Sequence, residues 1–532
     1  MSRTRPATPQ QAGRRAPLAE DRLWPLVRAR AQATPEGLCA VDERRERLSF
    51  AELRDRALRV AAALHDRGIG PGVRVAWQLP TWIESFVLVA ALARLSAVQN
   101  PLLPIYRERE LRFILRQARP RLLVVPRSFR GFDHEALARS TAALLAGETG
   151  ASPEILVCDR ALPEADPNGL PPFAAEPGAP VRWIFYTSGT TADPKGALHS
   201  DASLAAGSRG VAERFELGPD DRYPMVFPFT HIGGIGMLFV QLMAGCGAIL
   251  VETWDEEQTP PFLGEQGVTL AAGGTPLVMR YLAYQRRHRQ TRVFPKLRAA
   301  MGGAAPKPAL LQAEVAAELG GVGVVSVYGL TEVPFAATGS LHDPEDALAR
   351  TEGRAAGGAE LRIAAADGRP CAPGEEGEIR VRGPQVLRGY LDSKLEADAF
   401  DADGFFRTGD LGRLDAGGFL SVTGRLKDII IRNGENISAK EVEDVLYGHP
   451  GIAEAAVIGL PDPVTGERCC AVAVAREGAA LDLASLARWC AGAGLARQKL
   501  PERLELVAAL PRNASGKVLK HELRRRFTSE AP

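Results

Sequence analysis

The sequence has almost no excess of either charge sign. Its 532 residues include 65 lysines and arginines against 64 aspartates and glutamates, so the formal net charge at pH 7 is only +1. A protein that binds nucleic acid or an anionic membrane through its overall charge needs a clear basic excess. We therefore expect no nucleic-acid partner.

Long apolar runs are also missing. The longest, residues 86–93, ends at Arg94 and is far shorter than the roughly 20 residues of a membrane-spanning helix. We expect no membrane span. Residues 1–20 contain several arginines and no apolar core of the kind that secretion signals need. They are predicted to form a flexible N-terminal tail, with an organelle transit peptide or a cloning remnant as alternatives.

Cysteine is scarce, with 7 residues scattered along the chain. An odd and scattered set argues against a disulfide framework and is typical of a reducing compartment, so a cytoplasmic location is expected. Adjacent residues such as Cys469 and Cys470 seldom form an unstrained bridge. No cysteine and histidine cluster has the spacing of a zinc site.

The length predicts more than one domain. Up to about residue 356, short apolar segments alternate with helical patterns, which is typical of βαβ units on a mainly parallel sheet. The four residues 49–52 (SFAE) have the form of a capping box at the start of a helix. From about residue 357 the segments become short and the turns rich in glycine, which indicates an antiparallel region.

We place the domain boundary at residues 425–428. The predicted fold class is α/β, with a large N-terminal domain (residues 21–426) of mixed and parallel βα sheets and a β-barrel-like region. A small, mobile α+β domain follows (residues 427–532). Within it, residues 438–441 (SAKE) predict a second capping box.

One stretch, residues 183–197 (WIFYTSGTTADPKGA), organises the large domain. An apolar segment runs into small hydroxylated residues, whose backbone N–H groups and hydroxyls can approach a polyphosphate while a lysine supplies a positive charge. The common P-loop requires Gly-Lys before Ser or Thr, whereas here Lys195 precedes Gly196. An ordinary polar turn is the alternative interpretation.

Other apolar segments also end in small or polar residues, at 229–234, 302–306 and 328–332. Because ligands of parallel sheets bind at the carboxyl ends of the strands, we expect these segments to converge on one site.

Five motifs follow one another along the chain. They are the stretch at 183–197, YGLTE (328–332), GFFRTGDLG (404–412), GRLKDIIIRNGENIS (424–438) and PRNASGKVLK (511–520). This set resembles the adenylate-forming, AMP-binding superfamily of acyl-CoA synthetases, peptide-synthetase adenylation domains and luciferases. Residues 100–115 and 124–134 look most like medium-chain and alicyclic carboxylate–CoA ligases, such as cyclohexanecarboxylate–CoA ligase.

The resemblance implies two half-reactions. A small-molecule carboxylic acid and ATP give acyl-AMP and pyrophosphate, and the thiol of CoA then displaces AMP. The implied cofactors are ATP and Mg²⁺, with CoA as co-substrate. The implied nucleotide-binding residues are Thr187, Ser188, Gly189, Thr190, Thr191, Lys195, Gly303, Ala304, Ala305, Val327, Tyr328, Gly329, Thr331, Asp410, Arg425 and Lys517.

The resemblance also assigns roles within this set. Residues 187–191 and Lys195 would hold the β and γ phosphates, and Thr331 would contact the α-phosphate. Glu332 would bind Mg²⁺, for which a hard carboxylate oxygen is suited. Residues 303–305 with 327 and 328 would form the adenine slot. Asp410 would accept the ribose hydroxyls, and Arg425 would reach the ribose or a phosphate.

The catalytic residues implied by the resemblance are Lys517, Thr187, Glu332 and His231. Lys517 would reach between the carboxylate and the α-phosphate. Lys427 stands where the family has the hinge of its small domain, and rotation about it would bring the loop at Gly434 to the thiol tunnel. Outside these motifs, each of these residue types is more often solvated or packed.

The expected acyl pocket comprises His231, Ile232, Gly233 and Gly302. Amino-acid-activating relatives place an aspartate, and dihydroxybenzoate-activating relatives an asparagine, where this chain has Ile232. An apolar wall leaves a polar substituent without partners. The expected acid is therefore apolar, of medium-chain, alicyclic or simple aryl type.

Two other functions share the same motifs. One is an acyl-AMP ligase that loads the thiol of a carrier protein, and the other is a nucleotide-binding homologue without ligase activity. A homodimer is left open by the sequence.

Overall fold

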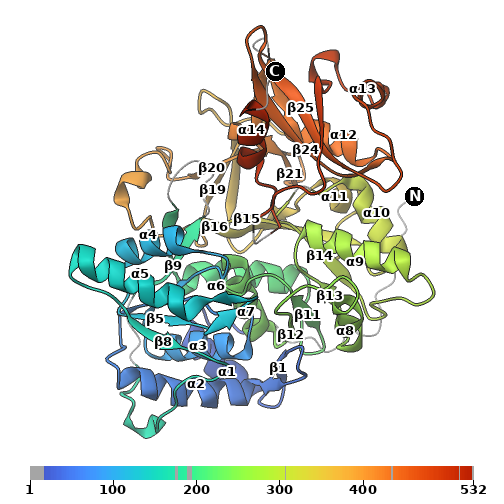
Figure 1. Ribbon diagram of the computed structural model, residues 1–532. Helices are drawn as coiled ribbons and strands as arrows, with labels where there is room; N and C mark the ends of the chain where they lie inside the picture. Colours follow the sequence, from blue (N-terminus) through green and yellow to red (C-terminus); the bar gives the residue numbers. More distant parts are fainter. Residues whose placement is uncertain are drawn as a thin grey trace.

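The computed structural model describes residues 17–173, 178–187, 194–305, 307–432, 435–513 and 516–529. Figure 1 shows a large domain, coloured blue to yellow, and a small domain in orange and red above it. Among the described residues, no helix is both long and apolar enough to cross a bilayer.

A six-stranded sheet forms one half of the large domain. Its inner strands run parallel, and an antiparallel hairpin closes one edge. In spatial order the strands are β10 (Lys195–Ser200), β9 (Val181–Thr187), β4 (Val98–Pro101), β3 (Arg74–Trp77), β5 (Leu122–Val125) and β8 (Glu154–Val157). The accompanying helices are α2 (Phe50–His65), α3 (Ile83–Arg94), α4 (Glu108–Ala118) and α5 (His134–Thr149).

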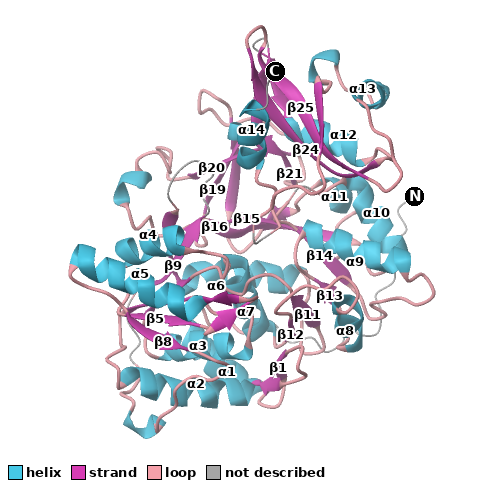
Figure 2. Cartoon of the chain, in the orientation of Figure 1, coloured by secondary structure: helices cyan, strands magenta, loops and turns pink. Residues whose placement is uncertain are grey.

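Two further sheets complete the α/β part of the large domain (Figure 2). One contains β11 (Arg222–Met225), β12 (Gly247–Leu250), β1 (Leu38–Val41) and β2 (Arg47–Ser49). The other contains β13 (Leu270–Ala271), β14 (Ala299–Gly302), β15 (Val324–Leu330), β16 (Val333–Thr338) and β17 (Arg354–Ala355). The helices of this part are α1 (Leu23–Ala33), α6 (Asp201–Arg214), α7 (Ile232–Ala244), α8 (Thr259–Glu265), α9 (Thr275–Arg287), α10 (Ala309–Glu318) and α11 (Glu345–Arg350).

The core lies around two helices that are buried almost completely. All of α3 is buried, with its charged residues Glu84 and Arg94 at its ends, and the mainly apolar α7 is buried apart from Gly233. The one polar side chain within α7 is Gln241, which donates to the Cys39 carbonyl and accepts from the Tyr223 hydroxyl at 3.0 Å. Its polar atoms are therefore satisfied inside the core.

The antiparallel region corrects one expectation. It forms an open sheet of β18 (Glu360–Ala364), β19 (Gly377–Arg382), β20 (Phe406–Leu414) and β21 (Leu420–Arg425). No strand pairing closes this sheet among the described residues, so the predicted barrel-like closure is wrong. Four strands are too few for a barrel, whose small examples use five to eight.

The small domain begins after a 3₁₀ turn at Leu426–Asp428. Its sheet has β23 (Glu435–Ser438), β22 (Ile429–Arg432), β25 (Gly466–Ala475) and β24 (Ile452–Asp462), and β26 (Arg503–Leu506) pairs with β25. The helices are α12 (Ala439–Tyr447), α13 (Leu483–Gly492) and α14 (Lys520–Ser529). The α+β composition agrees with the prediction.

The two predicted capping boxes have different outcomes. At α2 the Ser49 hydroxyl accepts from the Glu52 N–H, and the Glu52 carboxylate accepts from the Ser49 N–H, which confirms the box. At α12 only the bond from the Glu441 N–H to Ser438 forms. The Glu441 carboxylate pairs with Lys499 instead, at 2.7 Å, and the Ser438 hydroxyl donates to the Thr423 carbonyl of the large domain at 2.6 Å.

Candidate active site

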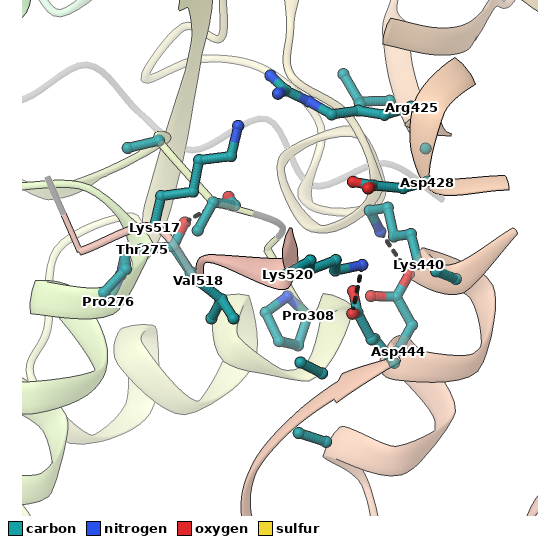
Figure 3. Close-up of a pocket in the computed structure, with 18 of the residues that line it drawn as sticks. Thr275, Pro276, Pro308, Arg425, Asp428, Lys440, Asp444, Lys517, Val518 and Lys520 are labelled. Carbon is teal, nitrogen blue, oxygen red and sulfur yellow. Dashed lines mark hydrogen bonds and ion pairs between the residues drawn. The ribbon is translucent and has the colours of Figure 1, made fainter. Parts of the chain in front are cut away.

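A cleft of about 390 Å³ separates the two domains. Its large-domain wall includes the loop after β14, the second half of β15, the middle of β20 and the end of β21, and its other wall comes from the small domain. Figure 3 shows Lys517 of the small domain and Arg425 at the end of β21 extending toward the same part of this cleft. The carboxyl ends of β14 and β15 thus reach the site where the strand pattern places them.

Asp410 forms the fixed anionic group of the cleft. Its carboxylate, only 4% exposed, lies in register with Arg425 on the neighbouring strand and pairs with it at 2.7 Å from Arg425 Nε to Asp410 Oδ1. The Tyr328 hydroxyl donates to Asp410 Oδ2 at 2.9 Å. Burial, together with the charge of Asp410, raises the pKa of Tyr328 well above its usual value, so this phenol stays protonated and keeps donating.

The loop after β14 lies close against β15. Gly303 has φ +140°, and a Cβ at this position would lie 2.6 Å from the Val327 carbonyl oxygen. Ala304 also has a positive φ, +61°. Thr275, the first residue of α9, donates its N–H to the Gly303 carbonyl at 2.9 Å and accepts from the Gly303 N–H at 3.2 Å. These two hydrogen bonds fix the loop, and its residues Gly303, Ala304 and Ala305 line the cleft.

Glu332 lies in the turn between β15 and β16. Tyr390 donates its hydroxyl to Glu332 Oε1 at 3.0 Å. Burial raises the pKa of Glu332, and the bond from Tyr390 and the charges of Lys195 and Arg425 oppose that rise. One carboxylate has about four lone-pair positions, so the two donors to Glu332, the Tyr390 hydroxyl and its own N–H, leave room for a cation.

Lys195 begins β10 and lies opposite Thr187, the last residue of β9. Its Nζ is 5.8 Å from the centre of the Tyr390 ring, so Tyr390 contacts both Lys195 and Glu332. Ser188, Gly189, Thr190 and Thr191 lie outside the described residues, as does Gly434. The structure therefore brings the two ends of the predicted phosphate loop together.

Lys517 is held by a tight turn. Its N–H donates to Asn513 Oδ1 at 2.9 Å, its carbonyl accepts from the Asn513 N–H at 2.9 Å, and Gly516 supplies a left-handed φ of +81°. Burial, and then the charge of Arg425, lowers the pKa of the Lys517 ammonium to about 8. Lys427 also lines the cleft.

His231 caps α7. Its Nδ1 accepts from the Gly233 N–H at 3.1 Å, and burial lowers its pKa to about 4. The ring is therefore neutral at pH 7 with its proton on Nε2. Ile232 packs into the core at 4% exposed, and Gly302 is buried at the end of β14. His231, Ile232 and Gly233 are contiguous, and neither they nor Gly302 line the interdomain cleft.

No group of three or more His, Cys, Asp or Glu side chains in the described ranges is arranged to hold a metal ion. A Mg²⁺ ion that accompanies a nucleotide does not need such a group, because one or two carboxylates plus phosphate oxygens suffice. Glu332, whose partly buried carboxylate accepts from the Tyr390 hydroxyl and from its own N–H, fits this requirement.

Sequence reasoning missed three residues around these groups: Thr275, Tyr390 and His199. Each makes its contact across a long sequence separation, for instance 58 residues between Tyr390 and Glu332. Periodicity and local motifs carry no signal for such pairs, although His199 follows the predicted stretch at 183–197 closely.

Comparison with known proteins matches two separate segments of the chain to known families. Residues 27–391 match the family described as AMP-binding enzyme, and residues 441–517 match the AMP-binding enzyme C-terminal domain. Glu332 and Lys517 lie within these two segments, whereas Asp410, Arg425 and Lys427 lie between them.

Similar proteins cover nearly the whole chain. The medium-chain fatty-acid–CoA ligase of Escherichia coli K12 is 31% identical over 508 residues, which are 93% of this chain and 88% of that protein. The salicyl-AMP ligase/salicyl-S-ArCP synthetase of Mycobacterium tuberculosis H37Rv is 35% identical over 500 residues, covering 90% and 85%. The structure of ATP-bound MatB from Rhodopseudomonas palustris has a TM-score of 0.85 and 30% identity, covering 96% of this chain and 99% of that one.

Gly303→Ala tests the backbone of the loop after β14. We expect a loss of about 1–3 kcal/mol in the free energy of unfolding, since an L-residue is strained at this φ and the added Cβ would meet the Val327 carbonyl. Urea unfolding measures the loss. Gly70→Ala is the matched control, because no atom lies within 4 Å of its Cβ position. Equal stability of the two variants would contradict the prediction.

Proposed function

The chain belongs to the AMP-binding enzyme family as an acid–thiol ligase of the acyl-CoA synthetase type, and on that premise we propose that it converts an apolar carboxylic acid to its CoA thioester. The acid and ATP form acyl-AMP and pyrophosphate, and the CoA thiol then displaces AMP. The acid is of the medium-chain, alicyclic or simple aryl type.

The main support for this proposal is the position of Lys517. Its side chain comes from the small domain and enters a cleft whose opposite wall holds Asp410 and Arg425. Attack of a carboxylate on the α-phosphate brings two anions together and builds charge on the phosphate oxygens, which preorganised cations stabilise. Lys517 supplies such a cation at the junction of the domains.

The remaining groups then have consistent roles. Asp410 accepts the ribose hydroxyls, and the loop at 303–305 with Tyr328 receives the adenine. Lys195 and residues 187–191 hold the β and γ phosphates, and Thr331 contacts the α-phosphate. Glu332 would hold Mg²⁺, which when bound screens the charge of the phosphates.

Support for an apolar acid comes from α7. This helix presents no charged side chain, and its single polar one, Gln241, is already bonded within the core. The neutral His231 ring adds a donor and no positive charge. A charged substituent on the acid would lose its hydration without gaining a partner there.

The small domain is proposed to rotate between the two half-reactions about the turn that contains Lys427. The turn connects β21 to β22 directly, and a few boundary residues suffice for such a motion. Rotation would withdraw Lys517 and bring the loop at Gly434 toward the thiol.

Mass spectrometry of reactions with ATP, Mg²⁺ and a panel of carboxylic acids, with and without CoA, tests this function. We expect acyl-CoA only in complete mixtures and acyl-AMP when CoA is omitted. Acyl-AMP that never becomes acyl-CoA would indicate a carrier-protein acceptor, which the salicyl-S-ArCP synthetase relative favours. ATP binding without any product would favour the homologue without ligase activity.

Lys517→Ala is expected to slow acyl-AMP formation by a factor of about 10² or more, the usual scale for losing one charge-stabilising group. Pyrophosphate release measures this step. Lys520→Ala is the matched control: Lys520 lines the same cleft, but its ammonium pairs with Glu443 at 2.7 Å, and we expect its rate to stay within about threefold. Similar losses in both variants would refute the role of Lys517.

The pH dependence of the same step follows from the lowered pKa of Lys517. A lysine is charged below its pKa, so kcat/KM for acyl-AMP formation, which reports on the free enzyme, is expected to fall as the pH rises above about 8. An unperturbed lysine would keep its charge to about pH 10. Lys517→Arg stays charged and should flatten the profile; a fall that persists in this variant would assign the titration to another group.

A further inference from the structure

His199 is a buried histidine that the predicted motifs do not use. It lies on β10, four residues after Lys195, and is 0% exposed. Side chains alternate between the two faces of a strand, so His199 and Lys195 belong to the same face of β10. Phe185 of β9 meets the His199 ring edge to face at 6.1 Å between ring centres.

The two ring nitrogens have different partners. Nε2 lies 2.9 Å from the Thr331 carbonyl oxygen, and Nδ1 lies 3.0 Å from the Ser203 hydroxyl. A carbonyl oxygen can only accept, so the proton is on Nε2. Burial lowers the pKa of His199 to about 4, which keeps the ring neutral and this tautomer fixed at neutral pH.

The Thr331 carbonyl belongs to the turn that carries the proposed phosphate and Mg²⁺ contacts. The same turn is held from its other side, where the Leu387 N–H donates to the Glu332 carbonyl at 2.8 Å and Tyr390 donates to the Glu332 carboxylate. Residues 387–391 are in turn joined to β10, through the bond from the Leu391 N–H to the Gly196 carbonyl at 2.8 Å.

The turn and β10 are thus connected along two routes. One passes through residues 387–391, and the other is the direct bond from His199, which joins residues 132 positions apart. Among the described residues, only the direct bond reaches the peptide group between Thr331 and Glu332 from the strand that carries Lys195.

We infer that His199 is a positioning residue for MgATP: its Nε2–H fixes the turn at Thr331 and Glu332 relative to Lys195, so that the phosphates meet both groups at once. The inference rests on the proposed function of these groups. Because the bond acts on the phosphate side of the site, its loss should weaken MgATP binding and spare the interaction with the acid.

A pair of isosteric variants separates this role from general packing. The amide nitrogen of glutamine can occupy the place of Nε2 and donate to Thr331, whereas the shorter asparagine reaches only the place of Nδ1. We expect His199→Gln to keep KM for MgATP within about threefold of the wild-type value. We expect His199→Asn to raise it by about tenfold, with KM for the acid unchanged in both variants.

His134→Gln, whose amide reaches the place of Nε2 and leaves that of Nδ1 empty, is the control for losing the bond of a buried histidine. His134 is 1% exposed, its pKa is also lowered to about 4 by burial, and its Nδ1 lies 3.3 Å from Gln78. Thermal unfolding records the stability of all three variants. We expect the His134 variant to lose stability and to keep the wild-type KM for MgATP.

Binding of a non-cleavable ATP analogue with Mg²⁺, measured by calorimetry, repeats the comparison without turnover. A wild-type protein that forms no acyl-AMP would refute the proposed function, while the calorimetric Kd still tests His199. Equal Kd values for His199→Gln and His199→Asn would overturn the positioning role. A rise in KM for the acid parallel to that for MgATP would overturn it as well. A tenfold weaker Kd confined to the Asn variant would establish it.

Discussion

The ion pair between Asp410 and Arg425 is the interaction on which both the site and the domain arrangement depend. It joins two neighbouring strands in register, and Arg425 is the last residue of β21 before the turn that leads to the small domain. The pair therefore fixes the start of the small domain and orients a carboxylate at the same place. Tyr328 holds the second oxygen of Asp410, so the carboxylate has little freedom to rotate. The Arg425 side chain is 31% exposed, so the desolvation cost falls mainly on Asp410, and the bond from Tyr328 helps to offset it.

The cleft carries more positive than negative charge near Lys517. Arg425 and Lys427 both lower the pKa of the Lys517 ammonium, and Asp410 and Asp428 only partly oppose them. A bound triphosphate would offset this repulsion, because attraction between opposite charges is strong in a cleft of low dielectric constant. In the proposed reaction, the repulsion between Lys517 and Arg425 would return once pyrophosphate leaves. The charge arrangement that favours the nucleotide would then also favour the proposed withdrawal of the small domain.

The sequence was most informative where the physics is local. Alternating strand and helix patterns predicted the α/β fold, and the ordered motifs predicted membership of the adenylate-forming superfamily. The capping box at Ser49 depends on residues three apart and was predicted correctly, whereas the box at Ser438 fails because Thr423 and Lys499 compete for its members. The barrel-like closure was wrong because strand number, and not turn spacing, decides whether a sheet closes. Tyr390, Thr275 and His199 went unrecognised because their partners are brought close only by the folded chain.

His231 shows that a packing role and a substrate role need not exclude each other. The two interpretations compete when the sequence alone is considered, since a lone histidine in an apolar segment is more often packed. In the structure its Nδ1 caps α7 by accepting from the Gly233 N–H. That bond fixes the tautomer, so the ring must present its proton at Nε2, as His199 does toward Thr331. A cap that determines which nitrogen carries the proton prepares a neutral donor, and in the proposed acyl pocket such a donor would place no charge beside an apolar acid.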